Sequence, residues 1–169
     1  MILVGLPGAG KTTVGRAVAR ALGRRFLDFD EEIARRERRS IARIFSESGE
    51  SYFRELETAL TRQLAGERGM ILSPGGGWAT DPARVALLCP PARMIHLRVS
   101  SAVAVGRLGS DVSARPLLAS AGTPAAMVAI LEWLSREREA SYSRAEAAVD
   151  TEDVDLQGVI DRVTRLVAP

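Results

Sequence analysis

The stretch GLPGAGKT at residues 5–12 follows the pattern G-x-x-x-x-G-K-T. The four residues before it, MILV, form a short apolar run that predicts a buried strand. From Thr12 to Leu22 apolar side chains recur at helical spacing, so a helix is expected to follow the loop directly. Strand, glycine loop and helix in this order are typical of a loop that binds the phosphates of a nucleotide.

The residue types of this loop suit phosphate chemistry. Glycines allow backbone N–H groups to converge on phosphate oxygens because no Cβ blocks the approach. Lys11 is the only lysine in the chain, and its compact ammonium can reach the β- and γ-phosphates. The hydroxyl of Thr12 can bind Mg²⁺. We predict that the loop contacts the nucleotide through Gly8, Ala9, Gly10, Lys11, Thr12 and Thr13.

Length and composition limit the class of protein. The 169 residues suffice for one domain with a sizeable core and are too few for two ordinary domains. A formal net charge of +2 gives no sign of a nucleic-acid-binding surface. No apolar run approaches the length of about 18 residues that a membrane span needs, and the single cysteine, Cys89, fits a reducing compartment. We expect a cytoplasmic monomer that binds neither nucleic acid nor membrane.

The rest of the chain alternates between short apolar runs and helical patterns. We predict further strands at residues 26–30, 69–73, 93–99 and 148–151. Helices are expected at 31–66 (with a break at 48–50), 80–88, 100–107, 124–148 and 156–167. This alternation predicts an α/β fold of three layers, in which a five-stranded parallel sheet carries helices on both faces. Residues 1–169 would form one domain.

Two acidic residues, Asp28 and Asp30, end the second predicted strand. In an open α/β sheet ligands bind at the carboxyl ends of the strands. If the strand continues to Asp30, both carboxylates point to the same side, which suits one near Mg²⁺ and one near a substrate hydroxyl. The alternative is that Asp30 caps the following helix.

Arg54 and Glu57 lie three residues apart in the helical region, and so on one helix face. They form either a surface ion pair or an arginine held in place to bind a carboxylate. Gly75, Gly76 and Gly77 follow the third strand, where they permit the close approach of a ligand or are only flexible.

Residues 109–122 are polar and resemble an active-site lid, with disorder as the alternative. Arg115 in this predicted lid can close over a triphosphate and stabilise charge in the transition state. The only histidine, His96, has no cysteine nearby, so we interpret it as structural.

Taken together, these motifs resemble the shikimate kinase family over essentially the whole chain. The features that carry the resemblance are the loop GLPGAGKT, D-x-D at Asp28 and Asp30, and F-R-x-x-E from Phe53 to Glu57. The triple glycine, R-P-L-L from Arg115 and R-x-x-x-Y from Arg138 to Tyr142 follow in the family's order.

The resemblance implies a phosphate-loop kinase fold and ATP-dependent phosphorylation of the 3-hydroxyl of shikimate, a step toward the aromatic amino acids. It implies that Lys11, Asp30 and Arg115 are catalytic, and that Thr12 and Asp28 hold Mg²⁺. Arg107 would stack on adenine and Arg115 would contact the ATP phosphates. The predicted substrate-binding helices span residues 31–65. The implied shikimate contacts are Asp30, Phe45, Phe53, Arg54, Gly75, Gly76, Gly77 and Arg138.

Two residues depart from the family pattern. Phe29 stands inside D-x-D, where the family commonly has Thr or Ser, and Trp78 follows the triple glycine, where a smaller residue is usual. Trp78 would reshape the substrate pocket if it points into that pocket, and would mean little if it points into the core. Two alternative functions are a related small-metabolite kinase of the gluconate type and a shikimate-kinase-like ligand sensor without catalysis.

Overall fold

The computed structural model describes residues 1–109, 112 and 115–167. Its centre is a parallel sheet of five strands in the order β2-β3-β1-β4-β5. The strands are β1 (Ile2–Val4), β2 (Arg25–Asp28), β3 (Met70–Ser73), β4 (Met94–Arg98) and β5 (Ala147–Asp150). All four pairings are parallel, so the predicted α/β architecture is confirmed.

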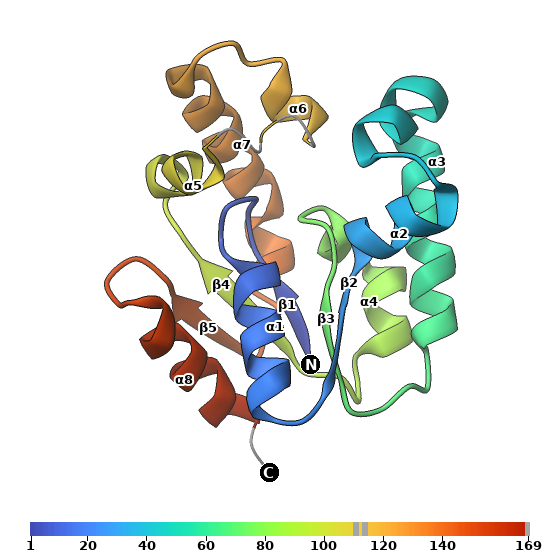
Figure 1. Cartoon of the computed structure of the whole chain (residues 1–169), viewed down its shortest axis with the longest axis vertical. Coiled ribbons are helices and arrows are strands. Elements are labelled where there is room, and N and C mark those ends of the chain that lie inside the picture. Colours follow the sequence, from blue (N-terminus) through green and yellow to red (C-terminus); the bar gives the residue numbers. More distant parts are fainter. Residues whose placement is uncertain (110–111, 113–114, 168–169) are drawn as a thin grey trace.

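Helices cover both faces of the sheet (Figure 1). They are α1 (Lys11–Ala21), α2 (Phe29–Glu37), α3 (Ile41–Leu64), α4 (Pro82–Leu88), α5 (Ser101–Leu108), α6 (Pro116–Ala119), α7 (Pro124–Tyr142) and α8 (Leu156–Val167). A short 3₁₀ helix, η1 (Trp78–Thr80), precedes α4. None of the helices in the described residues is both long enough and apolar enough to cross a membrane.

Alternation along the strands divides the core into two layers. In β1, Ile2 and Val4 face one layer and Leu3 faces the other, as the two-residue period of a strand requires. The layer around Leu3 packs against α1 and α8. The opposite layer holds Phe29, Trp78 and Tyr142 together with residues of α3, α4 and α7.

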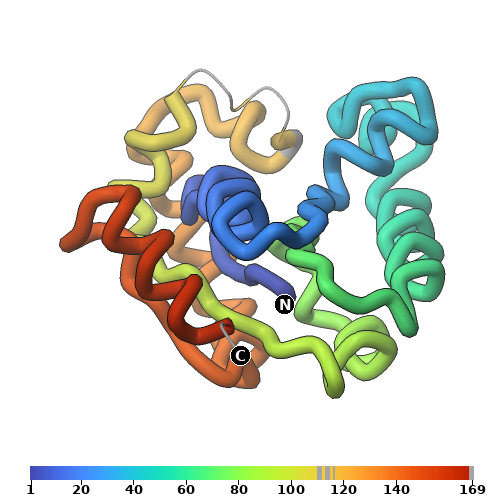
Figure 2. The backbone as a smooth tube through the Cα atoms, turned by 60° about the horizontal axis from the view of Figure 1, so that its bottom comes forward, coloured from blue at the N-terminus to red at the C-terminus, as the bar shows by residue number. Residues whose placement is uncertain are grey.

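The helices that rise above the sheet stand on two sides of the phosphate loop. Helices α2 and α3 lie on one side, and α5 and α6 lie on the other (Figures 1 and 2). The first strand points at this region, because the carboxyl ends of parallel strands share one edge of the sheet. A site built here therefore draws residues from both groups of helices.

The predicted boundaries agree with the structure only in part. The predicted helix at 124–148 ends at Tyr142, because the chain must turn before β5 can pair with β4 from Ala147. The predicted lid contains a helical turn, α6, and its residues 110, 111, 113 and 114 lie outside the described part of the chain. The break at 48–50 is confirmed as a kink in α3, where Gly49 takes a φ of 81°.

Candidate active site

The phosphate loop connects β1 to α1. Gly5 and Gly8 have φ angles of 148° and 82°, which other residues rarely adopt. A Cβ at Gly5 would lie 2.4 Å from the carbonyl oxygen of Leu97, and one at Gly8 would lie 2.5 Å from that of Ala104. Both glycines thus let the loop lie directly against the backbone of β4 and α5. Packing against these backbone atoms therefore requires glycine at both positions, in addition to any need for open space at a phosphate.

Lys11 begins α1 and folds back over the loop. Its Nζ donates to the carbonyl oxygens of Gly5 and Leu6, at 3.0 and 3.1 Å. The helix N-cap, Gly10, provides no side-chain acceptor, so the first N–H groups of α1 face the loop without a side-chain cap. Burial, and after it the neighbouring charge of Arg115, lower the pKa of Lys11 to about 8, against the opposing effect of Asp30 and Asp28. The loop is an electropositive cradle for an anion.

Asp28 organises the adjacent strand end. Its Oδ2 accepts hydrogen bonds from Thr12 Oγ1 at 2.7 Å and from Ser73 Oγ at 3.0 Å. Thr12 and Asp28 therefore place a hydroxyl and a carboxylate side by side at the end of the loop. Oxygen ligands of this kind suit Mg²⁺, which usually keeps several waters and takes few protein ligands. Ser73 is not among the predicted site residues, although it pairs with Asp28 in the register of β2 and β3.

The predicted geometry of Asp28 and Asp30 is wrong in one respect. Strand β2 ends at Asp28, which is the N-cap of α2, so the two acids are not strand neighbours on one side. Asp28 Oδ1 accepts from the backbone N–H groups of Asp30 and Glu31, at 3.0 and 3.3 Å. The alternative that Asp30 is the cap is also wrong, since Asp28 satisfies the first amides of the helix.

Asp30 lies in the first turn of α2 with its carboxylate directed at the site. Its Oδ1 is buried and has no hydrogen-bond partner among the described residues. Burial, and after it the negative charges of Asp28 and Glu57, raise the pKa of Asp30 to about 6. Lys11 and Arg115 oppose this rise. An acceptor of this kind, ionised near neutral pH and unpartnered, is suited to take a proton from a hydroxyl.

The triple glycine lies between Asp30 and the two predicted carboxylate-binding arginines. A Cβ at Gly76 would lie 2.6 Å from Arg138 Nη1, and one at Gly77 would lie 2.7 Å from Arg54 Nη2. At Gly75 a Cβ would lie 3.3 Å from Asp30 Oδ1. The glycines therefore let both guanidinium groups and the carboxylate lie on the backbone of one short loop.

Arg54 and Arg138 reach this loop from different elements. The predicted pair of Arg54 and Glu57 is present, with Arg54 Nη1 donating to Glu57 Oε2 at 2.6 Å. One turn after Arg138 in α7, Tyr142 donates its hydroxyl to the carbonyl oxygen of Gly76 at 2.7 Å. Tyr142 also stacks on His96, with 4.6 Å between ring centroids. His96, on β4, thus packs against Tyr142. Burial lowers the pKa of the His96 imidazole to about 4.

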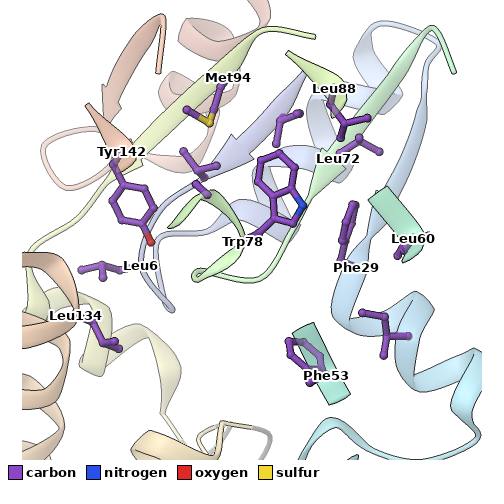
Figure 3. Close-up of a cluster of buried hydrophobic side chains, with 14 of the residues drawn as sticks. Leu6, Phe29, Phe53, Leu60, Leu72, Trp78, Leu88, Met94, Leu134 and Tyr142 are labelled. Atoms are coloured by element: carbon purple, nitrogen blue, oxygen red, sulfur yellow. The ribbon is translucent and has the colours of Figure 1, made fainter. Parts of the chain in front are cut away.

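Phe29 and Trp78 contact each other in the core. Their rings form a T-shaped pair with centroids 6.4 Å apart (Figure 3). Trp78 is fully buried, and its Nε1 donates to Thr61 Oγ1 at 2.9 Å. The Trp78 side chain therefore points into the core. Both departures from the family pattern belong to one aromatic contact behind the site.

The predicted nucleotide residues line a cavity of about 670 Å³. It contains the predicted loop contacts Gly8, Ala9, Gly10, Lys11, Thr12 and Thr13, together with Asp28, Asp30, Arg107 and Arg115. Arg107 donates to Thr151 Oγ1 and to the Thr151 carbonyl oxygen, at 2.8 and 2.5 Å. The Nε of Arg115 is buried without a partner among the described residues.

The remaining predicted substrate contacts do not line this cavity. Phe45 and Phe53 pack against each other, with ring centroids 4.8 Å apart. They belong to the same helical arm as Arg54, on α3. The predicted nucleotide residues and the predicted substrate contacts thus form two adjacent regions, and Asp30 belongs to both.

A glycine loop between a parallel strand and a helix, with a Lys–Thr pair and a strand-end carboxylate beside it, defines a nucleotide-binding protein of the phosphate-loop class. The family model described as shikimate kinase matches residues 7–168. The chain belongs to the shikimate kinase family.

Individual relatives agree with this assignment. The shikimate kinase of Geobacter sulfurreducens is 38% identical over 167 residues, which cover 99% of this chain and 90% of that protein. A shikimate kinase from Mycobacterium tuberculosis is 44% identical over 118 residues, which cover 70% of this chain and 66% of that protein.

Solved structures agree as well. A shikimate kinase from Acinetobacter baumannii in complex with shikimate has a TM-score of 0.88 and 32% identity, over 98% of this chain and 90% of that chain. A gluconokinase from Sinorhizobium meliloti has a TM-score of 0.60 and 18% identity, over 98% of this chain and 94% of that chain, which is a likeness of fold alone. The chain is thus a phosphotransferase with an alcohol acceptor.

Proposed function

We propose that this chain transfers the γ-phosphoryl group of Mg²⁺-ATP to the 3-hydroxyl of shikimate. The observation that carries the proposal is the position of Asp30. Its Oδ1, which has no hydrogen-bond partner within residues 1–109, 112 and 115–167, lies beside the triple glycine, and the same carboxylate lines the nucleotide cavity. A group placed between two binding regions is suited to act on a hydroxyl that attacks a bound phosphoryl group.

On the nucleotide side, Lys11 and Arg115 would neutralise charge on the phosphates. Both guanidinium and ammonium groups stabilise the charge that develops during phosphoryl transfer. Thr12 and Asp28 would hold Mg²⁺, which supplies charge neutralisation between the β- and γ-phosphates when bound. The N-terminus of α1 would receive phosphate oxygens. Arg107 would lie against the adenine.

On the acceptor side, Arg54 and Arg138 would bind the shikimate carboxylate from two directions. Their guanidinium groups lie on the backbone of Gly77 and Gly76, so they are already close to one another. Bidentate arginine–carboxylate contacts orient a planar anion as well as attract it. Asp30 would orient the 3-hydroxyl and accept its proton, and the absence of a side chain at Gly75 leaves room for the carboxylates of Asp30 and Glu57.

The same proposal places the protein in the cytoplasm as a monomer. Both halves of the site come from one chain, and the single Cys89 is free. Sedimentation of the purified chain at assay concentration tests whether it is a monomer, since a dimer would appear at twice the mass of 18.2 kDa.

The test is an assay of ADP release with Mg²⁺-ATP and shikimate, gluconate or no acceptor. We expect turnover that depends on shikimate and a rate with gluconate near that of the acceptor-free control. Turnover on gluconate alone would favour the related metabolite kinase. Tight binding of ATP and shikimate without turnover would favour a sensor and contradict the proposal.

A further inference from the structure

Arg84 is a buried charged residue outside the nucleotide cavity and outside the predicted shikimate contacts. It lies in α4 with a relative exposure of 4%. We propose that Arg84 is a positioning residue for the acceptor site, because it fixes Glu57 and through Glu57 fixes Arg54. This inference rests on the proposed function, in which Arg54 binds the carboxylate of the acceptor.

The geometry forms a short chain of alternating charges. Glu57 Oε2 accepts from Arg54 Nη1 at 2.6 Å and from Arg84 Nη1 at 2.7 Å. Arg84 Nε in turn donates to Asp81 Oδ2 at 3.1 Å. Asp81 is the N-cap of α4 and accepts from the backbone N–H of Ala83 at 2.9 Å. The start of α4 is therefore linked to Arg54 through one carboxylate oxygen.

Glu57 depends on this contact because it is fully buried. Its second oxygen, Oε1, has no hydrogen-bond partner among the described residues and faces Gly75, where a Cβ would lie 2.9 Å away. Burial raises the pKa of Glu57, and Arg54 and Arg84 oppose the rise. A buried carboxylate stays ionised only when enough positive charge is close.

Arg54 and Arg84 differ in their exposure and in their other hydrogen-bond partners. The side chain of Arg54 is 28% exposed and also donates to Glu50 from its Nε and Nη2, at 3.1 and 2.8 Å. Arg84 is enclosed, and its side-chain hydrogen bonds within the described part of the chain go to Glu57 and Asp81. When Arg54 engages an acceptor carboxylate, Arg84 keeps Glu57 charged and in place.

Both cations and anions surround Glu57. Arg54 and Glu50 face it from α3, Arg84 and Asp81 from the start of α4, and Asp30 from α2. Asp30 is a negative neighbour that also favours protonation of Glu57. Removing Arg84 would therefore leave Arg54 as the nearest cation of a carboxylate with a like charge beside it.

The experiment compares Arg84→Met, which removes the charge, with Arg84→Lys, which keeps it. The matched control is Arg93→Met, because Arg93 also pairs with a glutamate, Glu146, but on the exposed surface. KM for shikimate, KM for ATP and kcat are measured at pH 7 to 9 with the other substrate saturating. Circular dichroism establishes that each variant is folded.

We expect Arg84→Met to raise KM for shikimate about tenfold or more at pH 7, the size of losing one hydrogen bond to a charged group. KM for ATP should stay within twofold. Because the pKa of Glu57 rises when a cation is removed, KM for shikimate should fall again as the pH increases. Arg84→Lys should recover most of the affinity, and Arg93→Met should match the wild type.

A folded Arg84→Met variant with unchanged KM for shikimate, or with equal changes for both substrates, would overturn the proposal. If Arg84→Met does not fold, the double variant Glu57→Gln with Arg84→Met leaves no uncompensated buried charge there. It should show a raised KM for shikimate without the pH dependence, and a wild-type KM would overturn the proposal. A wild-type chain without shikimate-dependent turnover would instead contradict the proposed function, and this inference with it.

Discussion

The nucleotide half and the acceptor half of the site are built by different means. The nucleotide half is formed mainly by consecutive residues, 5–12, between a strand and a helix, and Asp28, Arg107 and Arg115 join it from other segments. The acceptor half is formed by side chains from α2, α3, α7 and the loop after β3. Arg54 in this half is held by Glu57, which also pairs with Arg84, a residue 27 positions away in the sequence. The first half should therefore depend on the few residues in the loop, and the second also on residues that touch no ligand.

The largest expected effect comes from the nucleotide half. Lys11→Ala should lower kcat by about 100- to 1000-fold, the loss typical of one charge-stabilising donor. Arg20→Ala on the exposed side of the same helix is the control and should keep the wild-type rate. Steady-state kinetics at saturating substrates measure the effect. A kcat near normal in Lys11→Ala would mean that the loop binds without contributing to catalysis.

A smaller effect is expected from one arm of the carboxylate clamp. Arg138→Ala should raise KM for shikimate by about 10- to 100-fold, because one hydrogen-bonded ion pair to the acceptor is lost. The exposed Arg136 lies on the same helix, so Arg136→Ala should leave KM unchanged. The comparison between the two halves would fail if KM for ATP rose as much as KM for shikimate.

The two halves should respond to pH in opposite directions, and beyond the relevant pKa each kcat/KM should change about tenfold per pH unit. Asp30 must be ionised to accept a proton, so kcat/KM for shikimate should fall as the pH drops below about 6, where its pKa lies. Lys11 must be charged to receive phosphate, so kcat/KM for ATP should fall as the pH rises above about 8. Both slopes refer to the free enzyme. An acidic limb that persists in Asp30→Asn would assign that limb to another group.

The smallest expected effect concerns the aromatic contact behind the acceptor half. In a double-mutant cycle with Phe29→Leu and Trp78→Leu, the coupling free energy should be about 0.5–1.5 kcal/mol. Chemical denaturation of the four proteins measures it. A coupling of zero would mean that the two departures from the family pattern arose independently of their contact.

The strand, loop and helix of the nucleotide half were predictable from the sequence because the information for them is local. The residues 5–12 specify their own turn, and the apolar period of each strand specifies the sheet. The pair Arg54 and Glu57 was also predictable from its helical spacing. Asp30 was assigned to a strand because the apolar pattern continues through Phe29, whereas the N-cap preference of Asp28 ends the strand there.

The acceptor half was predicted only in part because its geometry depends on distant contacts. Ligand approach was the reason expected for Gly76 and Gly77, yet Arg138 and Arg54 already occupy the space that their side chains would need. The orientation of Trp78 stayed open until its contact with Phe29 was known. Arg84 resembles any exposed helical arginine in sequence, since its partner Glu57 lies 27 residues away.

The chain's single lysine makes the nucleotide site chemically addressable. Apart from the α-amino group, Lys11 carries the only primary amine, and its pKa of about 8 leaves more free amine near neutral pH than an ordinary lysine has. A reagent that acylates amines should therefore modify one side chain, and that side chain lies in the phosphate loop. Protection by a nucleotide, followed as one mass increment on the intact protein, would report occupancy of the loop without any acceptor or turnover.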